Sequence, residues 1–369
     1  MVKYKPSDVI LECSPLVYYI DLTCEKVFCN HCLREWFQLF PCPACGSIFY
    51  CSKLCAAKDW ESIHQWECKY YRKSLKSSTE GISLLASSSH ARFMLRMMII
   101  ANRFPEKLTK VFDTPFGSRC FNQLEDHRKK ILEQENGIGS LAYPIAHELH
   151  EMGFQFDAEQ FINCYCRVQV NSFSIYEASR GTIGTGMYVA AAIFNHSCKP
   201  NCCQFFTGTR MQVKAIREFD TKNEPPVVSY INPRLPKAQR IALLNDCYFF
   251  SCQCSRCIGS EEFPGINLMD LEREFSTLVS NHEYEKAFRV GLKSLKLTLR
   301  IVTLFFPPTV TFFFQLIQVA EKINHPNFRS FKIIWKKNCA ITQDLENSVR
   351  KFLDGINLGS DIDSDQKIK

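Results

Sequence analysis

The sequence predicts an α+β protein in which a strand-rich core is interrupted by a small metal-binding module and a helical insertion, and is followed by further helices. Short runs of β-branched and aromatic residues lie near the N-terminus and return between positions 161 and 232, which is typical of strands. Cysteines recur in pairs between positions 29 and 68, a spacing typical of zinc sites. Helical periodicity dominates residues 92–160 and 266–356.

Composition places the chain among ordinary globular proteins. It has 369 residues, of which 46% are hydrophobic and 22% charged, enough for about two or three domains with a buried core. The formal net charge is +7, but the basic residues are spread along the chain rather than gathered in an arm. A solvated basic surface is therefore preferred to a dedicated DNA-binding face.

The 20 cysteines indicate reduced, metal-binding thiols. Their C-x-x-C pairing and the lack of a signal peptide favour the cytosol or nucleus over an oxidising compartment. The most apolar window, Ile301–Phe314, is 14 residues long and contains Pro307 and Pro308. Because a spanning helix needs about 20 residues, we expect no membrane span and interpret this window as a buried, kinked helical segment.

The first 24 residues contribute two predicted strands. Asp8–Glu12 and Leu16–Ile20 are short, rich in β-branched or aromatic residues, and divided by Pro15. Both are expected to join the core formed by later strands.

Residues 29–68 carry eight soft donors, enough for two tetrahedral zinc ions. The donors fall into pairs, Cys29/Cys32, Cys42/Cys45, Cys51/Cys55 and His64/Cys68. Ser52–Cys68 lacks glycine and proline and is expected to be helical, which places His64 and Cys68 on one face. The alternative, that these cysteines are only small buried apolar residues, is disfavoured by the regular spacing. A segment this short depends on metal binding to fold.

A serine-rich stretch, residues 74–90, is interpreted as a linker. From Arg92 to Gln160 the apolar periodicity predicts helices. The methionines within this region, including Met97 and Met98, are expected in the core rather than against a cofactor.

Residues 161–232 return to a strand-like pattern. Phe161–Val170 is expected to be helical and Asn171–Ile175 to be a strand. The glycines at 181, 184 and 186 are a weak phosphate-loop signal, because no strand-to-helix context with a following Lys-Ser/Thr accompanies them. A hairpin is predicted around the turn Thr207–Thr209.

The segment Asn195–Asn201 follows an apolar run, Met187–Phe194, that is expected to be buried. Polar groups emerging there need hydrogen-bond partners, because burying them unpaired costs about 1–3 kcal/mol each. Cys198 and a downstream C-x-C-x-x-C turn form a candidate four-thiolate zinc site, whose members are Cys198, Cys252, Cys254 and Cys257. Closing it would fold the downstream segment onto Asn195 and His196 and create a pocket.

Residues 266–356 are expected to be helical, with a tetratricopeptide-like face that must pack on neighbouring elements. The face comprises Tyr284, Ala287, Val290 and Leu295.

The order of these motifs resembles a known family. Asn195-His-Ser-Cys-x-Pro-Asn is followed by Ser229-Tyr230-Ile231 and by Tyr248-x-Phe250-x-Cys252-x-Cys254-x-x-Cys257. This series resembles the SET-domain lysine methyltransferases, and with the module of residues 29–68 it resembles the SET-and-MYND family over most of residues 1–259. The family's Gly-Glu-Glu turn is replaced here by Lys222–Pro226.

The resemblance implies a division of the chain into part of a SET domain at 1–24, a MYND zinc finger at 29–68, a helical SET insertion at 90–160, the core SET domain at 161–232, a post-SET zinc segment at 233–259 and a helical tetratricopeptide-like C-terminal region at 266–356. It also implies a Gly-x-Gly segment before the first strand, so a truncated N-terminus and a shortened C-terminal region are expected. In the finger, the resemblance assigns Cys29, Cys32, Cys51 and Cys55 to one zinc ion and Cys42, Cys45, His64 and Cys68 to another. With the Cys198 site, three zinc ions are expected.

The resemblance further implies S-adenosylmethionine as cofactor. Methyl transfer to lysine is an in-line displacement that needs alignment of the reactants and an uncharged amine. The implied catalytic residues are Tyr230 and Tyr248, the implied cofactor-binding residues are Asn171, Asn195, His196, Tyr230 and Phe250, and the implied substrate-channel residues are Phe173 and Tyr248. Taken singly, a strand tyrosine or one histidine is more often a core residue; the order of the motifs favours the functional assignment.

The leading hypothesis is a protein-lysine methyltransferase acting on histone or non-histone proteins in the nucleus and cytoplasm, as a monomer. The alternative is a non-enzymatic MYND adaptor or co-repressor that binds proline-containing peptides and has an inactive SET fold. The missing Gly-x-Gly favours the adaptor, and the intact Asn195, His196, Tyr230 and Phe250 favour the enzyme. Direct DNA binding is not expected, because the chain has no concentrated Lys/Arg stripe.

Overall fold

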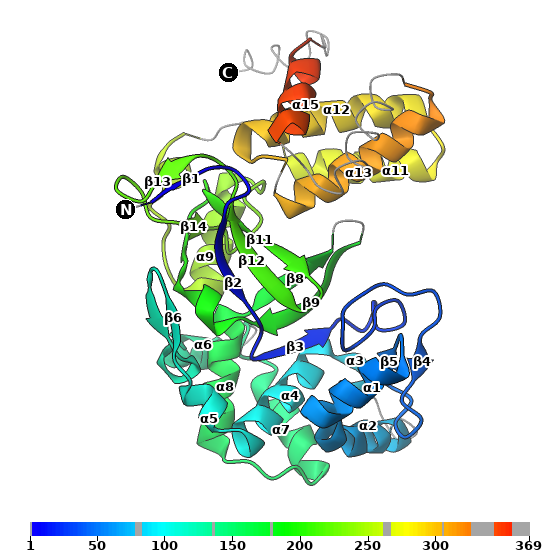
Figure 1. The fold of residues 1–369 in the computed structure, drawn as a ribbon, viewed down its shortest axis with the longest axis vertical. Coiled ribbons are helices and arrows are strands. Elements are labelled where there is room, and N and C mark those ends of the chain that lie inside the picture. Colours follow the sequence, from blue (N-terminus) through cyan, green and yellow to red (C-terminus); the bar gives the residue numbers. More distant parts are fainter. Residues whose placement is uncertain are drawn as a thin grey trace.

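The computed structural model has a strand-rich centre with helices at both ends (Figure 1). The insertion helices and the cysteine-rich finger lie at one end, and the C-terminal helices lie at the other. The structure describes residues 2–77, 83–134, 137–177, 180–260, 267–304, 306–325 and 343–355. This is the α+β architecture expected from the sequence.

Two three-stranded antiparallel sheets form the centre, and each takes one strand from the N-terminal segment. Their orders are β11-β12-β2 and β3-β9-β8. The strands are β2 (Val9–Cys13), β3 (Val17–Ile20), β8 (Phe173–Glu177), β9 (Gly181–Met187), β11 (Cys202–Thr207) and β12 (Arg210–Ala215). The two predicted N-terminal strands and the predicted hairpin are confirmed.

Short strand pairs extend this framework. β1 (Lys3–Tyr4) pairs antiparallel with β13 (Phe219–Asp220). β10 (Asn195–His196) pairs in parallel with β14 (Val227–Val228). The second pair brings the Asn-His motif beside the segment that leads to Tyr230.

The glycines of β9 permit a close approach of two strands. A Cβ at Gly184 would lie 2.2 Å from the carbonyl oxygen of Tyr19 on β3, so any larger residue would push the strands apart. These glycines therefore belong to a central strand, and the weak phosphate-loop signal has a packing explanation.

The cysteine-rich finger consists of a small hairpin followed by a helical rod. Its elements are β4 (Phe40–Pro41), β5 (Phe49–Tyr50), α1 (Lys53–Asp59), a π-helical turn η1 (Trp60–His64) and α2 (Gln65–Ser77). The rod begins where the Ser52 hydroxyl accepts the backbone N–H of Cys55 at 3.1 Å, which satisfies a free helix donor. The predicted helix is confirmed, with a π turn interrupting it.

The serine-rich stretch at 74–90 was wrongly predicted to be a linker. α2 continues to Ser77, and α3 (Leu84–Ser87) and α4 (Ser89–Arg103) follow; residues 78–82 of the stretch lie outside the described residues. The Ser88 hydroxyl accepts the N–H of Ala91 at 3.2 Å and so caps α4. Serine favours both linkers and helix starts, so composition alone misleads here.

The insertion is helical, as predicted. It comprises α4, α5 (Glu106–Thr109), the 3-10 turn η2 (Phe121–Gln123), α6 (Arg128–Glu133), α7 (Ala142–Glu151) and α8 (Ala158–Asn171). Met97 and Met98 are fully buried in its core. A hairpin of β6 (Phe112–Thr114) and β7 (Gly117–Arg119) was not predicted, because three-residue strands give no usable periodicity.

A buried charge network attaches the finger to α4. Arg96 is 1% exposed and donates two hydrogen bonds to the Glu67 carboxylate, at 2.7 and 2.8 Å. Its guanidinium also lies 3.5 Å from Asp59 and donates to the carbonyl of Tyr18 on β3. One arginine therefore holds the finger, the insertion and the second sheet together.

The C-terminal part of the chain is helical. Its elements are α9 (Lys237–Tyr248), α10 (Ser255–Ile258), α11 (Leu268–Ser280), α12 (Tyr284–Ile301), α13 (Pro307–Lys322) and α15 (Gln343–Gly355). Ala287 and Leu295 of the predicted face are fully buried, and Tyr284 and Val290 pack at the edge of the same core.

One expectation for this region is wrong. Pro307 does not kink a continuous helix but begins α13, because proline needs no N–H partner at a helix start. Among the described helices, none is long and apolar enough to cross a membrane.

Replacing Arg96 with methionine should leave Glu67 buried without its arginine partner, with only His64 and Tyr71 still in hydrogen-bond contact. We expect the free energy of unfolding, measured by urea denaturation of the zinc-loaded chain, to fall by about 3–5 kcal/mol. The matched control is Arg128→Met, because Arg128 and its partner Glu159 are exposed and such pairs contribute little. Equal urea midpoints for both variants would contradict the proposed role of the Arg96 network.

Candidate functional site

Two cavities share part of their lining, here called the shared wall. The first, here called the His196 cavity, measures about 610 Å³ and is lined by Asn195, His196, Tyr230 and Phe250. The second, here called the Phe173 cavity, measures about 400 Å³ and lies beneath the start of α13. Residues that line both are Val170, Asn171, Ala192, Tyr230 and Tyr248. All the residues that the sequence assigned to cofactor and substrate thus line one or both cavities.

Tyr230 is held in the shared wall by three hydrogen bonds. Its hydroxyl donates to the carbonyl of Phe194 at 2.7 Å, and its backbone N–H donates to Nδ1 of His196 at 3.0 Å. The hydroxyl of Tyr248 donates to the Tyr230 carbonyl at 3.1 Å. Burial raises the pKa of Tyr230 to about 12, so its hydroxyl is protonated at neutral pH.

His196 connects Tyr230 to the cysteines downstream. Because Nδ1 accepts the Tyr230 N–H, Nε2 carries the proton of the neutral ring, and it lies 3.2 Å from Sγ of Cys198. Burial, together with the nearby charge of Arg240, lowers the pKa of His196 to about 4. The neutral side chain therefore orients Tyr230 in the wall, and His196 lines the cavity from β10.

The wall also holds Asn171, at the end of α8. Its side-chain amide donates to the carbonyls of Glu125 and Arg167, at 2.8 and 2.9 Å. Among the described residues none donates a hydrogen bond to its amide oxygen, which leaves that oxygen for a ligand. Phe173, two residues later, lines only the Phe173 cavity.

Hydrogen bonds fix the segment Lys222–Pro226, which stands before Tyr230 in place of the expected Gly-Glu-Glu turn. Glu224 accepts two hydrogen bonds of 2.6 Å from Arg217. The fully buried side chain of Asn201 accepts the N–H of Val227 at 2.7 Å and donates to the carbonyl of Pro225 at 2.9 Å. Lys222–Pro226 thus reaches β14 in a defined geometry without the Gly-Glu-Glu sequence.

Cys198 meets the downstream cysteines as expected. The four sulfurs of Cys198, Cys252, Cys254 and Cys257 all lie within 4.8 Å of one another, and those of Cys198 and Cys257 are 3.5 Å apart. This group is called the downstream cluster below. Tyr248 and Phe250 pack against it. The Phe250 ring lies 5.8 Å from that of His196, and the Tyr248 ring lies 5.1 Å from that of Tyr230.

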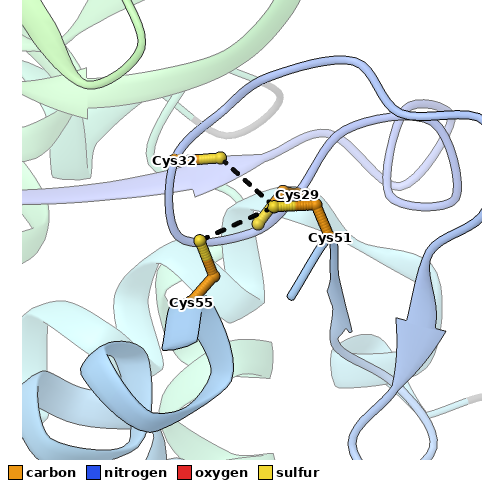
Figure 2. Close-up of side chains that lie close together, drawn as sticks. All are labelled: Cys29, Cys32, Cys51 and Cys55. Carbon is orange, nitrogen blue, oxygen red and sulfur yellow. Dashed lines mark hydrogen bonds between the residues drawn. The ribbon is translucent and has the colours of Figure 1, made fainter. Parts of the chain in front are cut away.

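The two predicted groups of the finger are also assembled. Figure 2 shows the side chains of Cys29, Cys32, Cys51 and Cys55 gathered at one point, with Cys55 reaching it from α1. Sγ of Cys51 lies 3.7 Å from Sγ of Cys32 and 3.6 Å from Sγ of Cys55.

The second finger group, Cys42, Cys45, His64 and Cys68, is fully buried. Nε2 of His64 is 3.6 Å from Sγ of Cys45. Nδ1 of His64 is 3.0 Å from Glu67, an arrangement that orients a zinc-binding histidine. Asp59 and Glu67 also gather near His64, but Arg96 occupies both carboxylates.

The geometry of all three groups fits zinc. Tetrahedral zinc with Zn–S bonds of about 2.3 Å separates its sulfurs by about 3.8 Å, which matches the observed 3.5–3.9 Å. Near the downstream cluster, buried Arg256 donates to the Cys198 carbonyl, and buried Arg240 has an Nε without a hydrogen-bond partner. These cations complement the net negative charge that a four-thiolate zinc site would carry.

Sequence reasoning missed the part of the His196 cavity that the insertion provides. Leu124, Glu125 and His127 line it opposite Phe250. His127 has a left-handed backbone, φ +43°, and its ring lies 5.2 Å from that of Phe249, which is also left-handed at φ +61°. No spacing signal marks these residues, since they come from a loop between η2 and α6.

Known proteins share these features. Residues 29–68 match the MYND finger family. A human histone-lysine N-methyltransferase, SMYD3, is 28% identical over 255 residues, which is 69% of this chain and 56% of that protein. Human N-lysine methyltransferase SMYD2 is 27% identical over 263 residues, with 70% and 57% covered. SET domain and MYND-type zinc finger protein 6 of Schizosaccharomyces pombe is 30% identical over 256 residues, with 69% and 48% covered.

The chain belongs to the SET-and-MYND family. It spans about half the length of the curated relatives that it matches. Two of these relatives are named as lysine methyltransferases, and the MYND match supports zinc at the finger.

The metal content provides a direct test of the three cysteine groups. The purified chain should contain three zinc ions, one for each group, and Cys257→Ser should reduce the content to two because a ligand of the downstream cluster is lost. Elemental analysis of the dialysed protein measures this. Cys247→Ser is the matched control, since Cys247 precedes Cys252 closely in the sequence but is not a member of the cluster, and should retain three. A Cys257→Ser protein with undiminished zinc would contradict the assignment.

Proposed function

We propose that the protein is an S-adenosylmethionine-dependent methyltransferase that acts on lysine side chains of proteins, histone or non-histone. The observation that carries the proposal is the pair of cavities that meet at Tyr230, Tyr248 and Asn171. A methyltransferase needs two binding sites that approach each other at one point, because the methyl group must move directly from donor to acceptor.

The His196 cavity is the proposed cofactor site. S-adenosylmethionine, when bound, supplies an electrophilic methyl group on a sulfonium. In this proposal Asn195 and the free amide oxygen of Asn171 bind the amino-acid end, and His196 contributes its backbone. Phe250, whose ring lies 5.8 Å from that of His196, covers the adenine. The rings of Tyr230 and Tyr248, with centroids 5.1 Å apart, attract the sulfonium charge.

The Phe173 cavity is the proposed lysine site. The hydroxyls of Tyr230 and Tyr248 donate to backbone carbonyls, so their oxygens can accept hydrogen bonds from an incoming amine. Phe173 and the other aromatic walls exclude water, which lowers the pKa of the amine and favours its uncharged form. Tyr230 then orients the nitrogen lone pair toward the methyl group, and the proton released from the methylated amine passes to solvent.

Zinc has a structural part in this proposal. A full shell of four protein ligands leaves no open coordination position for substrate. The three ions would hold the finger together and keep Tyr248 and Phe250 against His196. Action in both the nucleus and the cytoplasm is part of the same proposal.

A second function is favoured by the exposed aromatic residues of the finger. Trp36 is 55% exposed, Phe37 is fully exposed and Trp60 is 45% exposed. Exposed aromatics of this kind bind proline-rich peptides in several domains. The finger would then recruit a proline-containing partner, either alongside methyl transfer or, if the SET fold is inactive, as an adaptor.

Tyr230→Phe separates binding from chemistry. Calorimetry should show that the variant binds S-adenosylmethionine as the parent does, whereas methyl transfer to protein lysine should fall about 10²-fold, the scale of losing alignment in an active site. Tyr143→Phe is the control, because Tyr143 is 77% exposed and outside both cavities. Unchanged turnover in Tyr230→Phe would remove the role given to that hydroxyl. No detectable cofactor binding by the parent would eliminate the enzyme proposal.

A further inference from the structure

Arg119 brings a permanent positive charge to the His196 cavity. It lies on β7 of the insertion and lines the cavity together with Asn195 and Asn171. Its Nη1 donates a hydrogen bond to the carbonyl of Ser118 at 3.0 Å. Within the described part of the chain its side chain forms no other hydrogen bond and no ion pair. Most of the five N–H donors of the guanidinium are therefore free for a ligand.

The hairpin β6–β7 determines where this charge lies. β7 contacts the 3-10 turn η3 (Val189–Ile193), which leads to β10. At the tip of the hairpin, the ring of Phe116 lies 5.6 Å from that of Phe194. Because Asn195 follows Phe194 directly in the sequence, the hairpin places Arg119 on the side of the cavity from which Asn195 comes.

The cavity also has an acidic residue, Glu125, which is separate from Arg119. Both residues line the cavity, but no ion pair joins them in the part of the chain that the structure describes. The backbone carbonyl of Glu125 accepts a hydrogen bond from the amide of Asn171 at 2.8 Å. The cavity thus presents a positive and a negative charge that do not neutralise each other, which suits a ligand that carries both signs.

S-adenosylmethionine carries both signs at its amino-acid end, as a carboxylate and an ammonium. The residues proposed above for this end, Asn195 and Asn171, supply neutral amides. An amide oxygen suits the ammonium, whereas a carboxylate that loses hydration needs a cationic donor. A guanidinium presents two parallel N–H groups that match the two carboxylate oxygens, and such charge-assisted bonds are roughly twice as strong as neutral ones.

We propose that Arg119 binds the carboxylate of S-adenosylmethionine and makes the His196 cavity selective for a cofactor with an intact amino-acid end. The proposal rests on the proposed methyltransferase function, because it takes this cavity as the cofactor site. Motif spacing does not mark Arg119, since it lies on a strand of three residues outside the motifs that carry the family resemblance.

The test compares two ligands that differ only in the carboxylate, S-adenosylmethionine and its decarboxylated form. Calorimetry uses the full zinc-loaded chain. The parent should bind S-adenosylmethionine about tenfold more tightly than the decarboxylated form. Arg119→Gln should remove this preference, because it weakens binding of S-adenosylmethionine and leaves that of the decarboxylated form unchanged. Arg103→Gln is the control and should behave as the parent, since Arg103 is exposed and lies outside both cavities.

Charge reversal provides a second variant in case the first does not fold. Arg119→Glu should bind the decarboxylated form more tightly than S-adenosylmethionine, because the new carboxylate repels that of the cofactor. Equal affinity of the parent for the two ligands, a preference that persists in the variants, or an equal loss of affinity for both ligands would overturn the role of Arg119. These results leave the methyltransferase proposal standing, whereas a parent that binds neither ligand would overturn both proposals.

Discussion

The four sulfurs of the downstream cluster determine where the aromatic rings of the site lie. Cys198 is two residues beyond His196, and Cys252 is two residues beyond Phe250. When these sulfurs are brought within 4.8 Å of one another, the two short tethers bring the Phe250 ring to a centroid distance of 5.8 Å from the His196 ring. Tyr248 packs on the same cluster and against Tyr230. A zinc ion bound by these four thiolates would have a full ligand shell and no open position, so it would shape the cavity without taking part in chemistry.

His196 shows how this constraint reaches the shared wall. One ring nitrogen faces the sulfur of Cys198 and the other accepts the backbone N–H of Tyr230. A single buried histidine is more often a core residue whose hydrogen bonds are all made. Here His196 contacts both the cluster and Tyr230, so the position of the cluster determines that of the tyrosine. The arrangement needs a neutral ring with one donor and one acceptor, which burial maintains.

The elements that could be predicted from the sequence carry strong local signals. The ligands of the finger repeat at zinc spacing, and β2, β3 and the β11–β12 hairpin alternate or cluster in a way that strands require. The elements that could not be predicted depend on context. The hydroxyl of Ser88 caps α4 where composition indicated a linker, and Pro307 starts a helix instead of bending one. His127 joins the His196 cavity through a left-handed backbone that leaves no trace in residue spacing.

The two central sheets unite strands that are distant along the chain. Tyr19 pairs with Thr185 and Leu11 with Val213, and the whole finger and insertion lie between the partners. Closing such long loops costs entropy and slows folding. During synthesis the finger is complete at residue 68, while β2 and β3 still present unpaired edges to their surroundings. The nascent chain therefore passes through a long interval of exposure to aggregation, in which chaperones become important for its yield.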